Sequence, residues 1–264
     1  MQGVTHYMID EWNPDEEFNV MIFQKHVKEI MEDIYNRGKI PILVGGTGFY
    51  IQAVLNDIAF TKEKQGDEIR ADLQNLAKEK GASYLHHELQ KVDKESAEAI
   101  HPNNIKRVIR ALEYFQSTGQ KFSDHNKEER QKGSPYNFLY LVLTMNRKVL
   151  YERIDKRVDQ MMEEGLVKEV KQLLDAGYSR NLVSMQGLGY KEIASALFKE
   201  CTMEEAVYRL KRDTRHFAKR QMTWFRRERD VTMINKDNFS NNHEIVNYIM
   251  KLAVEKGICS CREG

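Results

Sequence analysis

Three glycines and a threonine form the stretch of this sequence best suited to holding an anion. Gly45, Gly46, Thr47 and Gly48 follow the apolar run 40–44 and lead into a second apolar run. Glycine lets a backbone turn sharply and approach a ligand or another part of the chain closely. Backbone N–H groups at a helix start can hold a phosphate. Many strand-to-helix turns use glycine for the turn alone, so this stretch predicts either a phosphate site or an ordinary turn.

The strongest cluster of positive charge lies in one long predicted helix, residues 203–229. Its segment 209–229 holds nine Lys or Arg residues against two acids. The spacing of four of these cations places them on one face of the helix; these are Arg212, Arg215, Lys219 and Arg226. A solvent-exposed helix face usually carries both positive and negative side chains, whereas this stripe carries positive ones alone. It therefore predicts phosphate binding. A merely basic surface helix is the alternative.

A second basic cluster begins the predicted helix 105–117. Lys106, Arg107 and Arg110 lie within five positions of one another, and Arg107 and Arg110 share a face. The cluster could bind an anion, or it could form ordinary ion pairs, for instance with Glu113.

Two arginines one turn apart could form a two-pronged anion site. Arg153 and Arg157 are spaced i and i+4, and guanidinium groups match the geometry of phosphate oxygens. Pairing with acids of the same helix is the alternative, and on the spacing alone it is favoured; those acids are Glu152, Asp155 and Asp159.

A further glycine-broken turn precedes the predicted helix 191–197. The segment 185–191 offers free N–H groups, the aromatic Tyr190 and the cation Lys191. It could contact a ligand, or it could be a tight loop with Tyr190 packed inward.

The elements that must position these residues alternate between helix and strand at both ends of the chain, whereas residues 66–135 show no strand pattern. The predicted elements are helix 15–36, a buried parallel strand 40–44, a buried helix after Gly48, helices 67–80, 83–91, 93–100 and 105–117, strand 136–145, a helix capped by Asn146, helices 166–174, 191–197 and 203–229, strand 231–234 and helix 242–256. Residues 126–134 are predicted to be mobile. The pattern predicts an α/β core from residues 1–65 and 134–264, with an all-helical insertion domain at 66–133.

Composition sets the remaining bounds. The 264 residues are 41% hydrophobic and 31% charged, with a net charge of +1, so a nucleic-acid partner must be met by a local patch. No apolar run approaches the roughly 20 residues of a membrane helix. Three cysteines do not predict a disulfide framework, and the polar start predicts no signal peptide, so we expect a cytoplasmic protein. Walker-A, C-x-x-C and G-x-S-x-G motifs are all absent from the sequence, and the residues themselves predict no metal site.

Five motifs in order give the sequence a family resemblance. They are GGTGFY at 45–50, HPN with KRVIRALE between 101 and 113, RIDKRVDQM at 153–161, GLGYKE at 187–192 and KRQMTWFR at 219–226. Together they resemble the tRNA dimethylallyltransferase (tRNA isopentenyltransferase) family, over almost the whole chain.

The resemblance implies transfer of a dimethylallyl group from its diphosphate to N6 of adenosine 37, beside the anticodon. It implies a P-loop-type parallel-sheet core with a helical insertion, a need for Mg²⁺, a monomer, and two partners, dimethylallyl diphosphate and the tRNA anticodon stem-loop. The adenine would be turned out of its stack to meet the donor.

Site residues follow from the same resemblance together with the basic stripe. Thr47 and Arg157 are the predicted catalytic residues, and Gly45, Gly46, Arg153 and Arg157 the predicted donor-binding residues. The predicted tRNA contacts are Thr47, Arg70, Lys106, Arg107, Val108, Ile109, Arg110, Gln186, Gly187, Leu188, Gly189, Tyr190, Lys191, Arg212, Arg215, Lys219, Arg220, Gln221, Met222, Thr223, Trp224, Phe225 and Arg226.

One departure from the family pattern concerns the start of the sequence. The family's P-loop, G-P-T-[AS]-x-G-K-[ST], and its D-S-x-Q-x-Y segment, whose Asp is the expected general base, do not occur here. We expect a truncated sequence or a start at an internal Met, with the Mg²⁺ ligands mainly in the missing segment and the 264 residues inactive alone.

Two other functions compete with the transferase. A catalytically inactive RNA-binding remnant of that enzyme is the first. A small-molecule P-loop kinase relative is the second, and it is disfavoured because the basic helix and insertion suit a polyanion larger than a nucleotide.

Overall fold

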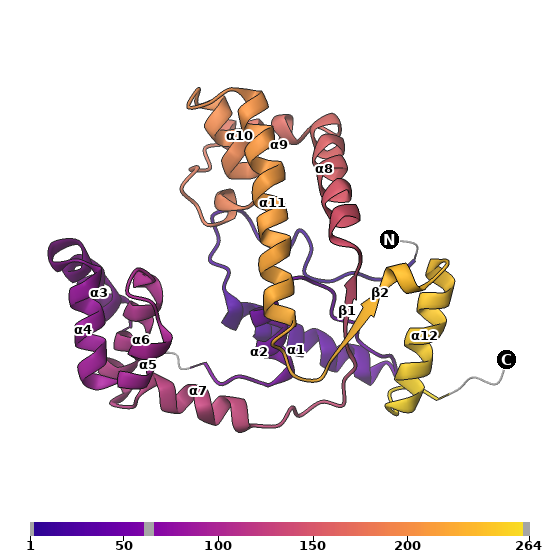
Figure 1. Ribbon diagram of the computed structural model, residues 1–264, viewed down its shortest axis with the longest axis horizontal. Coiled ribbons are helices and arrows are strands. Elements are labelled where there is room, and N and C mark those ends of the chain that lie inside the picture. The colour runs from indigo at the N-terminus through magenta and orange to yellow at the C-terminus, as the bar shows by residue number, and fades with distance from the viewer. Residues whose placement is uncertain (1–2, 61–65, 261–264) are drawn as a thin grey trace. The chain divides into compact units, whose positions relative to one another are not determined.

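The computed structural model describes residues 3–60 and 66–260, and the chain divides into two compact units. The first unit comprises Met1–Val54 and Tyr136–Gly264, and the second is Leu55–Pro135. The predicted boundary between residues 65 and 66 therefore falls inside the second unit. The elements of the described residues (Figure 1) are α1 Val20–Asn36, α2 Gly48–Leu55, α3 Gly66–Lys80, α4 Ala82–Val92, α5 Lys94–Ala99, α6 Ile105–Thr118, α7 Phe122–Gln131, β1 Tyr140–Thr144, α8 Arg147–Glu163, α9 Leu166–Asp175, η1 Ser184–Gln186, α10 Tyr190–Leu197, α11 Met203–Phe225, β2 Val231–Asn235, η2 Lys236–Asn238 and α12 Asn242–Glu255.

Two parallel strands form the sheet of the first unit. β1 pairs with β2, with Tyr140 opposite Val231 and Thr144 opposite Asn235, and the two arrows run side by side in Figure 1. Parallel pairing requires a long crossover connection, and helices α8 to α11 supply it here. Both strands were predicted, the first as a longer one, and the mixed α/β class is confirmed.

The strand predicted at residues 40–44 is wrong. The structure gives these residues no strand ladder, and Ile42 and Val44 are 83% and 86% exposed. Branched apolar residues favour extended backbone, but a strand needs a hydrogen-bonded neighbour, which the residue pattern alone cannot supply. The helix expected after the glycines is confirmed as α2, in which Ala53 and Val54 are fully buried.

Helix α1 begins later than its sequence predicted. Pro14 was expected near the helix start, but Asn19 is the N-cap, and its side chain accepts from the backbone N–H groups of Met21 and Ile22 at 2.9 and 3.1 Å. Asparagine is among the strongest N-cap residues because it satisfies donors that lack a partner inside the helix. The helix ends as expected before Gly38, whose φ is +66°.

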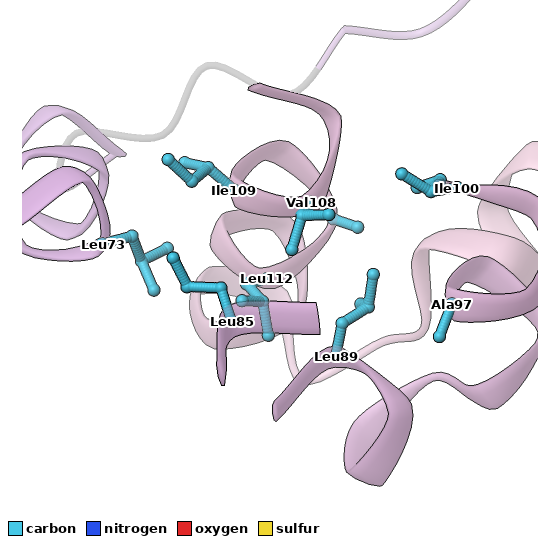
Figure 2. Packing of buried hydrophobic residues seen from close by; sticks show 9 residues of the cluster. Leu73, Leu85, Leu89, Ala97, Ile100, Val108, Ile109 and Leu112 are labelled. Atoms are coloured by element: carbon cyan, nitrogen blue, oxygen red, sulfur yellow. The ribbon is translucent and has the colours of Figure 1, made fainter. Parts of the chain in front are cut away.

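The second unit is built from helices alone among its described residues. Apolar side chains of α3, α4, α5 and α6 meet in one core, and Figure 2 shows Leu85 and Leu89 of α4 pointing toward Val108 and Leu112 of α6. All four helices were predicted from their spacing, and the all-helical character of this unit is confirmed.

Residues 122–131 correct the prediction of a mobile polar segment, because they form helix α7. The backbone N–H of Ser123 donates to the buried Asp93 carboxylate at 2.8 Å. The ring of Phe122 packs edge-on against Tyr114 with centroids 5.7 Å apart. These contacts join segments distant in sequence, so the polar composition of the segment does not reveal them.

The core of the first unit's helical region lies among α8, α9, α10 and α11. Val158, Val170, Ile193 and Leu210 supply one buried residue from each of these helices. Figure 1 shows α8 and α11 lying side by side. Helix α11 ends at Phe225, a turn before the predicted end at residue 229.

Candidate nucleic-acid interface

The end of helix α11 lies directly on the glycine turn. Gln221 donates from Nε2 to the carbonyl oxygen of Gly46 at 2.8 Å. A Cβ atom at Gly46 would lie 2.2 Å from that same nitrogen, and one at Gly48 would lie 2.1 Å from Nε1 of Trp224. The indole ring of Trp224 therefore requires glycine at position 48, whereas the Gln221 side chain that faces Gly46 ends in a flexible amide that can shift. A Cβ at Gly45 would meet nothing within 4 Å.

Thr47 stands exposed between these two glycines. The structure thus brings together four predicted site residues, Gly46 and Thr47 of the turn and Gln221 and Trp224 of α11. Positions 47 and 221 are far apart in sequence, and the two direct contacts on Gly46 and Gly48 hold the segments together.

The two aromatic residues at the end of α11 serve packing. Phe225 is buried, and its ring meets Tyr140 of β1 edge-on with centroids 6.2 Å apart. The indole Nε1 of Trp224 is buried and has no hydrogen-bond partner among the described residues. The Phe225 ring therefore fixes the helix on the sheet, and tRNA contact at this position stays a prediction.

Cations in the last two turns of α11 remain available. Lys219 and Arg226 are exposed and form no ion pair within the part of the chain that the structure describes. Arg220 lies over the ring of Phe217, 5.9 Å from its centroid, a weak contact that leaves its charge in solvent. Met222 and Thr223 complete the predicted set here, and Thr223 donates its hydroxyl to the Lys219 carbonyl at 3.0 Å.

The other half of the predicted basic stripe is neutralised by nearby acids. Arg215 pairs with Asp155 of α8 at 2.5 Å, and Arg212 pairs with Asp213 at 2.8 Å. The neighbouring Lys211 pairs with Asp159 of α8. The prediction of a helix face that carries positive charge alone is thus wrong for residues 211–215. Helix α8 supplies the acids that pair with Lys211 and Arg215, and these acids lie 50 or more positions earlier in the sequence. Among the described residues of the stripe, 219 and 226 keep unpaired charge.

The segment 186–191 borders a pocket of about 470 Å³. Gln186, Lys191 and Arg212 line it, together with Arg180, Glu192 and Arg209. The side-chain amide of Gln186 donates to the carbonyl of Arg180 at 2.7 Å. Three predicted contact residues therefore share one polar hollow.

The aromatic and apolar members of this segment pack inward. Tyr190 donates its hydroxyl to Glu169, and burial together with this bond raises its pKa to about 12. Leu188 and Tyr190 pack on the buried cluster of α8 to α11. Gly189 is buried and has a φ of +99°, so it forms the turn. The inward-packing alternative holds for Tyr190, while Gly187 remains exposed.

The two arginines of α8 differ in their surroundings. Arg157 donates to Glu164 at 3.1 Å, and both side chains stay more than half exposed. Glu164 was not among the acids considered as partners. Arg153 is exposed and has no ion pair within the described ranges. Both cations can reach an anion in solvent, since an exposed pair is held only weakly.

The helical unit carries a second group of cations, on α3 and α6. Lys106 and Arg107 are exposed on the first turn of α6. Arg70 and Arg110 both contact the buried carboxylate of Glu113, Arg70 at 2.8 Å and Arg110 at 3.2 Å. The alternative of ion pairing with Glu113 is thus confirmed for Arg110. Val108 and Ile109 are buried in the core (Figure 2), so their side chains serve packing, and tRNA contact at these two positions stays a prediction.

Comparison with known proteins decides the family. A model of the family described as IPP transferase matches residues 1–228. This chain belongs to that family. A tRNA dimethylallyltransferase from Lachnoclostridium phytofermentans is 56% identical over 98% of this chain and 82% of its own length. One from Acetivibrio thermocellus is 48% identical, over 93% and 78% respectively.

Solved structures agree with this IPP transferase assignment. The full-length tRNA isopentenylpyrophosphate transferase of Bacillus halodurans is 42% identical with a TM-score of 0.68, covering 97% of this chain and 81% of its own. A eukaryotic dimethylallyltransferase acting on tRNA is 26% identical with a TM-score of 0.75, covering 95% and 67%. The family resemblance inferred from five motifs is confirmed.

Neither a metal-binding cluster nor a membrane-spanning helix is found in the described part of this IPP transferase. Among residues 3–60 and 66–260, no group of three His, Cys, Asp or Glu side chains could hold a metal ion. No helix among them is long and apolar enough to cross a membrane.

Sequence reasoning missed several residues that organise the interface. Asp155 and Asp159 neutralise part of α11, although both were considered only as partners of α8 arginines. Glu113 was considered only as one possible ion-pair partner, yet it joins α3 to α6. Its position in an otherwise apolar helix face was the available signal, because an isolated acid at a core position needs a cationic partner.

Proposed function

We propose that this chain transfers a dimethylallyl group from dimethylallyl diphosphate to N6 of adenosine 37, next to the anticodon of a tRNA. Membership of the IPP transferase family and the names of its relatives support the reaction class. The observation that carries the proposal is the clamp between α11 and the glycine turn. It sets the exposed Thr47 and the unpaired cations Lys219 and Arg226 on joined segments.

The chemistry proposed is a substitution at one carbon. N6 of adenine bonds to C1 of the dimethylallyl group, the bond from C1 to the diphosphate oxygen breaks, and the N6 proton passes to a base. Negative charge grows on the departing diphosphate, so cations placed beside it lower the barrier. We assign that role to Arg153 and Arg157, with Gly45 and Gly46 contributing backbone N–H groups.

Proton removal and Mg²⁺ are not attributed to residues of this chain. No segment of the sequence matches the family's general-base motif, and the described residues hold no cluster that fits a metal. Mg²⁺ is proposed as a cofactor that would shield the diphosphate charge when bound.

The remaining tRNA contacts belong to cations and polar groups. Lys106, Arg107 and Arg110 of α6 and Lys219, Arg220 and Arg226 of α11 would meet phosphates, which supply most of the affinity in such complexes. Gln186 and Lys191 would contact the RNA from the rim of their pocket.

A transfer assay tests the proposal. Labelled dimethylallyl diphosphate, Mg²⁺ and an anticodon stem-loop RNA should yield labelled RNA, whereas the expectation from the missing motifs, that the 264 residues are inactive alone, predicts no labelled RNA. The matched control is the same RNA with inosine in place of the target adenosine, because inosine lacks the amino group that attacks. Equal labelling of both RNAs would contradict the proposal. Binding of the RNA without any transfer would favour the alternative, an inactive RNA-binding remnant.

Arg157 provides a test of donor binding. Arg157→Ala should weaken dimethylallyl diphosphate binding roughly 10- to 150-fold, because a charge-assisted contact contributes about 1.5–3 kcal/mol. It should leave RNA affinity nearly unchanged. Separate titrations of the two substrates measure this. Lys156→Ala, an exposed neighbour on α8, serves as the control and should change neither affinity. An equal loss for both substrates in Arg157→Ala would indicate a folding defect and contradict the assignment.

We propose further that the protein works as a monomer in the cytoplasm. Cys201 and Cys259 are free thiols, which suits a reducing compartment; Cys261 lies outside the described residues. Sedimentation of the purified chain with and without stem-loop RNA would test the oligomeric state.

A further inference from the structure

One buried carboxylate on α6 holds two arginines of the helical unit. Glu113 is only 2% exposed. Arg70 of α3 donates to it twice, from Nη2 to Oε1 at 2.8 Å and from Nε to Oε2 at 3.3 Å. Arg110, one turn earlier on α6, places Nη1 3.2 Å from the same Oε1. A single side chain therefore fixes guanidinium groups from two helices.

The core around Glu113 does not require a charge. Its buried neighbours on α6, among them Ile109 and Leu112, are apolar. Removing a carboxylate from water is costly, and a well-packed apolar residue in place of a buried ion pair is often equally or more stabilising. The stability of the unit alone therefore does not explain this residue. Its specific effect is on the two arginines that it holds.

Both arginines keep surface for another partner. Their side chains are 45% exposed for Arg70 and 38% exposed for Arg110. A guanidinium carries about five N–H donors in a rigid fork, and Arg70 uses two of these on Glu113. The remaining donors of a fixed fork suit an acceptor with several oxygens, such as a phosphate.

The neighbouring charges extend this arrangement. Lys106 and Arg107 are exposed, and they lie four and three positions before Arg110, which makes them its neighbours on the helix surface. Two of these four cations, Arg70 and Arg110, contact a carboxylate that is itself out of solvent. The exposed part of this cluster is cationic.

We propose that Glu113 is a positioning residue for RNA binding, which fixes Arg70 and Arg110 so that their free donors face phosphates of the tRNA. This rests on the proposed function. Holding a long side chain in its bound geometry before binding reduces the entropy cost of association. The carboxylate acts through the arginines and does not itself contact RNA.

The variant Glu113→Gln distinguishes a positioning role from a simple charge effect, because the two would change the affinity for stem-loop RNA in opposite directions. The variant keeps the size of the side chain and removes one negative charge. If charge alone mattered, stem-loop RNA would bind more tightly, since the cluster becomes more positive. Positioning predicts a loss of affinity of about tenfold at fixed salt, as for one or two weakened charge-assisted hydrogen bonds. Unchanged or tighter binding overturns the proposal.

A double-mutant cycle with Arg70→Ala excludes a purely structural effect. If Glu113 acts through Arg70, the loss of affinity caused by Glu113→Gln should shrink clearly once Arg70 is absent, whereas an independent folding defect should add fully. Full additivity in RNA affinity would overturn the proposal.

A matched control comes from the same unit. Glu129 is also a buried carboxylate, paired with Lys132, and Glu129→Gln should leave RNA affinity unchanged. A tenfold loss in this variant too would overturn the specific role of Glu113. If the wild-type chain binds no stem-loop RNA, the proposed function fails together with this inference. If wild-type binding and transfer are intact and only the Glu113 result is contrary, the inference alone fails.

Discussion

At the residue scale, Gly48 shows how one hydrogen atom in place of a methyl group allows two segments to meet. The indole of Trp224 occupies the position that a Cβ atom would take, with Nε1 at 2.1 Å and Cδ1 at 2.2 Å. An alanine here must push a bulky, half-buried ring away from the turn. Gly46 faces the end of a Gln221 side chain instead, which can move more cheaply.

Gly48→Ala should therefore destabilise the protein by about 1–3 kcal/mol, the usual cost of overpacking. Gly45→Ala is the matched control, because its new methyl group would meet nothing within 4 Å. Urea unfolding followed by tryptophan fluorescence measures both variants, and Trp224 itself should report the displacement. Equal midpoints for Gly48→Ala and Gly45→Ala would show that α11 does not press on the turn.

One buried and one partly buried tyrosine, Tyr140 and Tyr190, make the stability of the folded chain depend on pH. Burial raises the pKa of Tyr140 to about 12, with the charge of Glu228 adding to the shift. Burial and the bond to Glu169 raise the pKa of Tyr190 to about 12. An unfolded tyrosine ionises near pH 10, so the folded chain favours the neutral phenol. The resulting stabilisation is complete below about pH 10 and disappears as the pH rises through about 12.

Tyr190→Phe should consequently flatten the fall in stability between about pH 10 and pH 12. Urea midpoints at a series of alkaline pH values measure this slope. Tyr35→Phe, which changes an exposed tyrosine of α1, should keep the wild-type slope. A wild-type slope in Tyr190→Phe would mean that this phenol ionises as readily in the folded chain as in the unfolded one.

At the element scale, the fully buried Asp93 joins two short helices. It is the N-cap of α5, where it accepts from the backbone N–H of Ser96 at 3.0 Å and from its hydroxyl at 2.6 Å. It also accepts from Ser123 at the start of α7 at 2.8 Å. Burial alone would raise the pKa of this carboxyl, but these bonds outweigh burial and lower it. Its stabilisation is therefore present at neutral pH and disappears as the pH falls below the ordinary carboxyl range.

Asp93→Ala should destabilise the helical unit by about 3 kcal/mol, since it removes a cap and leaves buried donors without an acceptor. Hydrogen exchange of the α5 and α7 amides, together with urea unfolding, measures the effect on each helix. Glu98→Ala, an exposed change on α5, should stay within about 0.5 kcal/mol. Unchanged protection of α7 in Asp93→Ala would show that Ser123 does not depend on this carboxylate.

At the scale of the whole molecule, the partners of each cation decide whether its charge is available to a ligand or is held in an ion pair within the fold. Lys219 and Arg226 are exposed without an ion pair in the described ranges. Lys211 and Arg215, on the same helix, are paired with α8 and are each 24% exposed. The spacing of these cations in the sequence does not distinguish the paired from the unpaired ones.

The double variant Lys219→Ala, Arg226→Ala should lower the slope of log affinity against log salt by about two, one for each phosphate deprived of its cation, with little change in stability. Lys211→Ala, Arg215→Ala should instead lower stability and change the slope less. Fluorescence titration of a stem-loop RNA at several salt concentrations, with urea unfolding alongside, measures both. The same slope change in the two double variants would contradict this division of roles.

The sequence by itself determined most helices, both strands of the sheet, the helical insertion and the family. Helices such as α6 and α8 follow from apolar residues at helical spacing, from the N-cap Asn146 and from glycines such as Gly119, with φ of +71°. These signals lie within a few residues of the element that they specify. The family followed from five motifs whose order is itself information, and most of the cations in the site were named from them.

Only the tertiary structure decided which of those cations are available and which segments are paired. Arg215 meets Asp155 across 60 positions and Arg70 meets Glu113 across 43, and no periodicity within one helix reveals such a partner. Contacts with distant segments also explain why residues 40–44 form no strand and why residues 122–131 form helix α7. Each depends on whether a distant segment supplies a ladder or an anchoring carboxylate, and that is set by packing between elements rather than by local pattern.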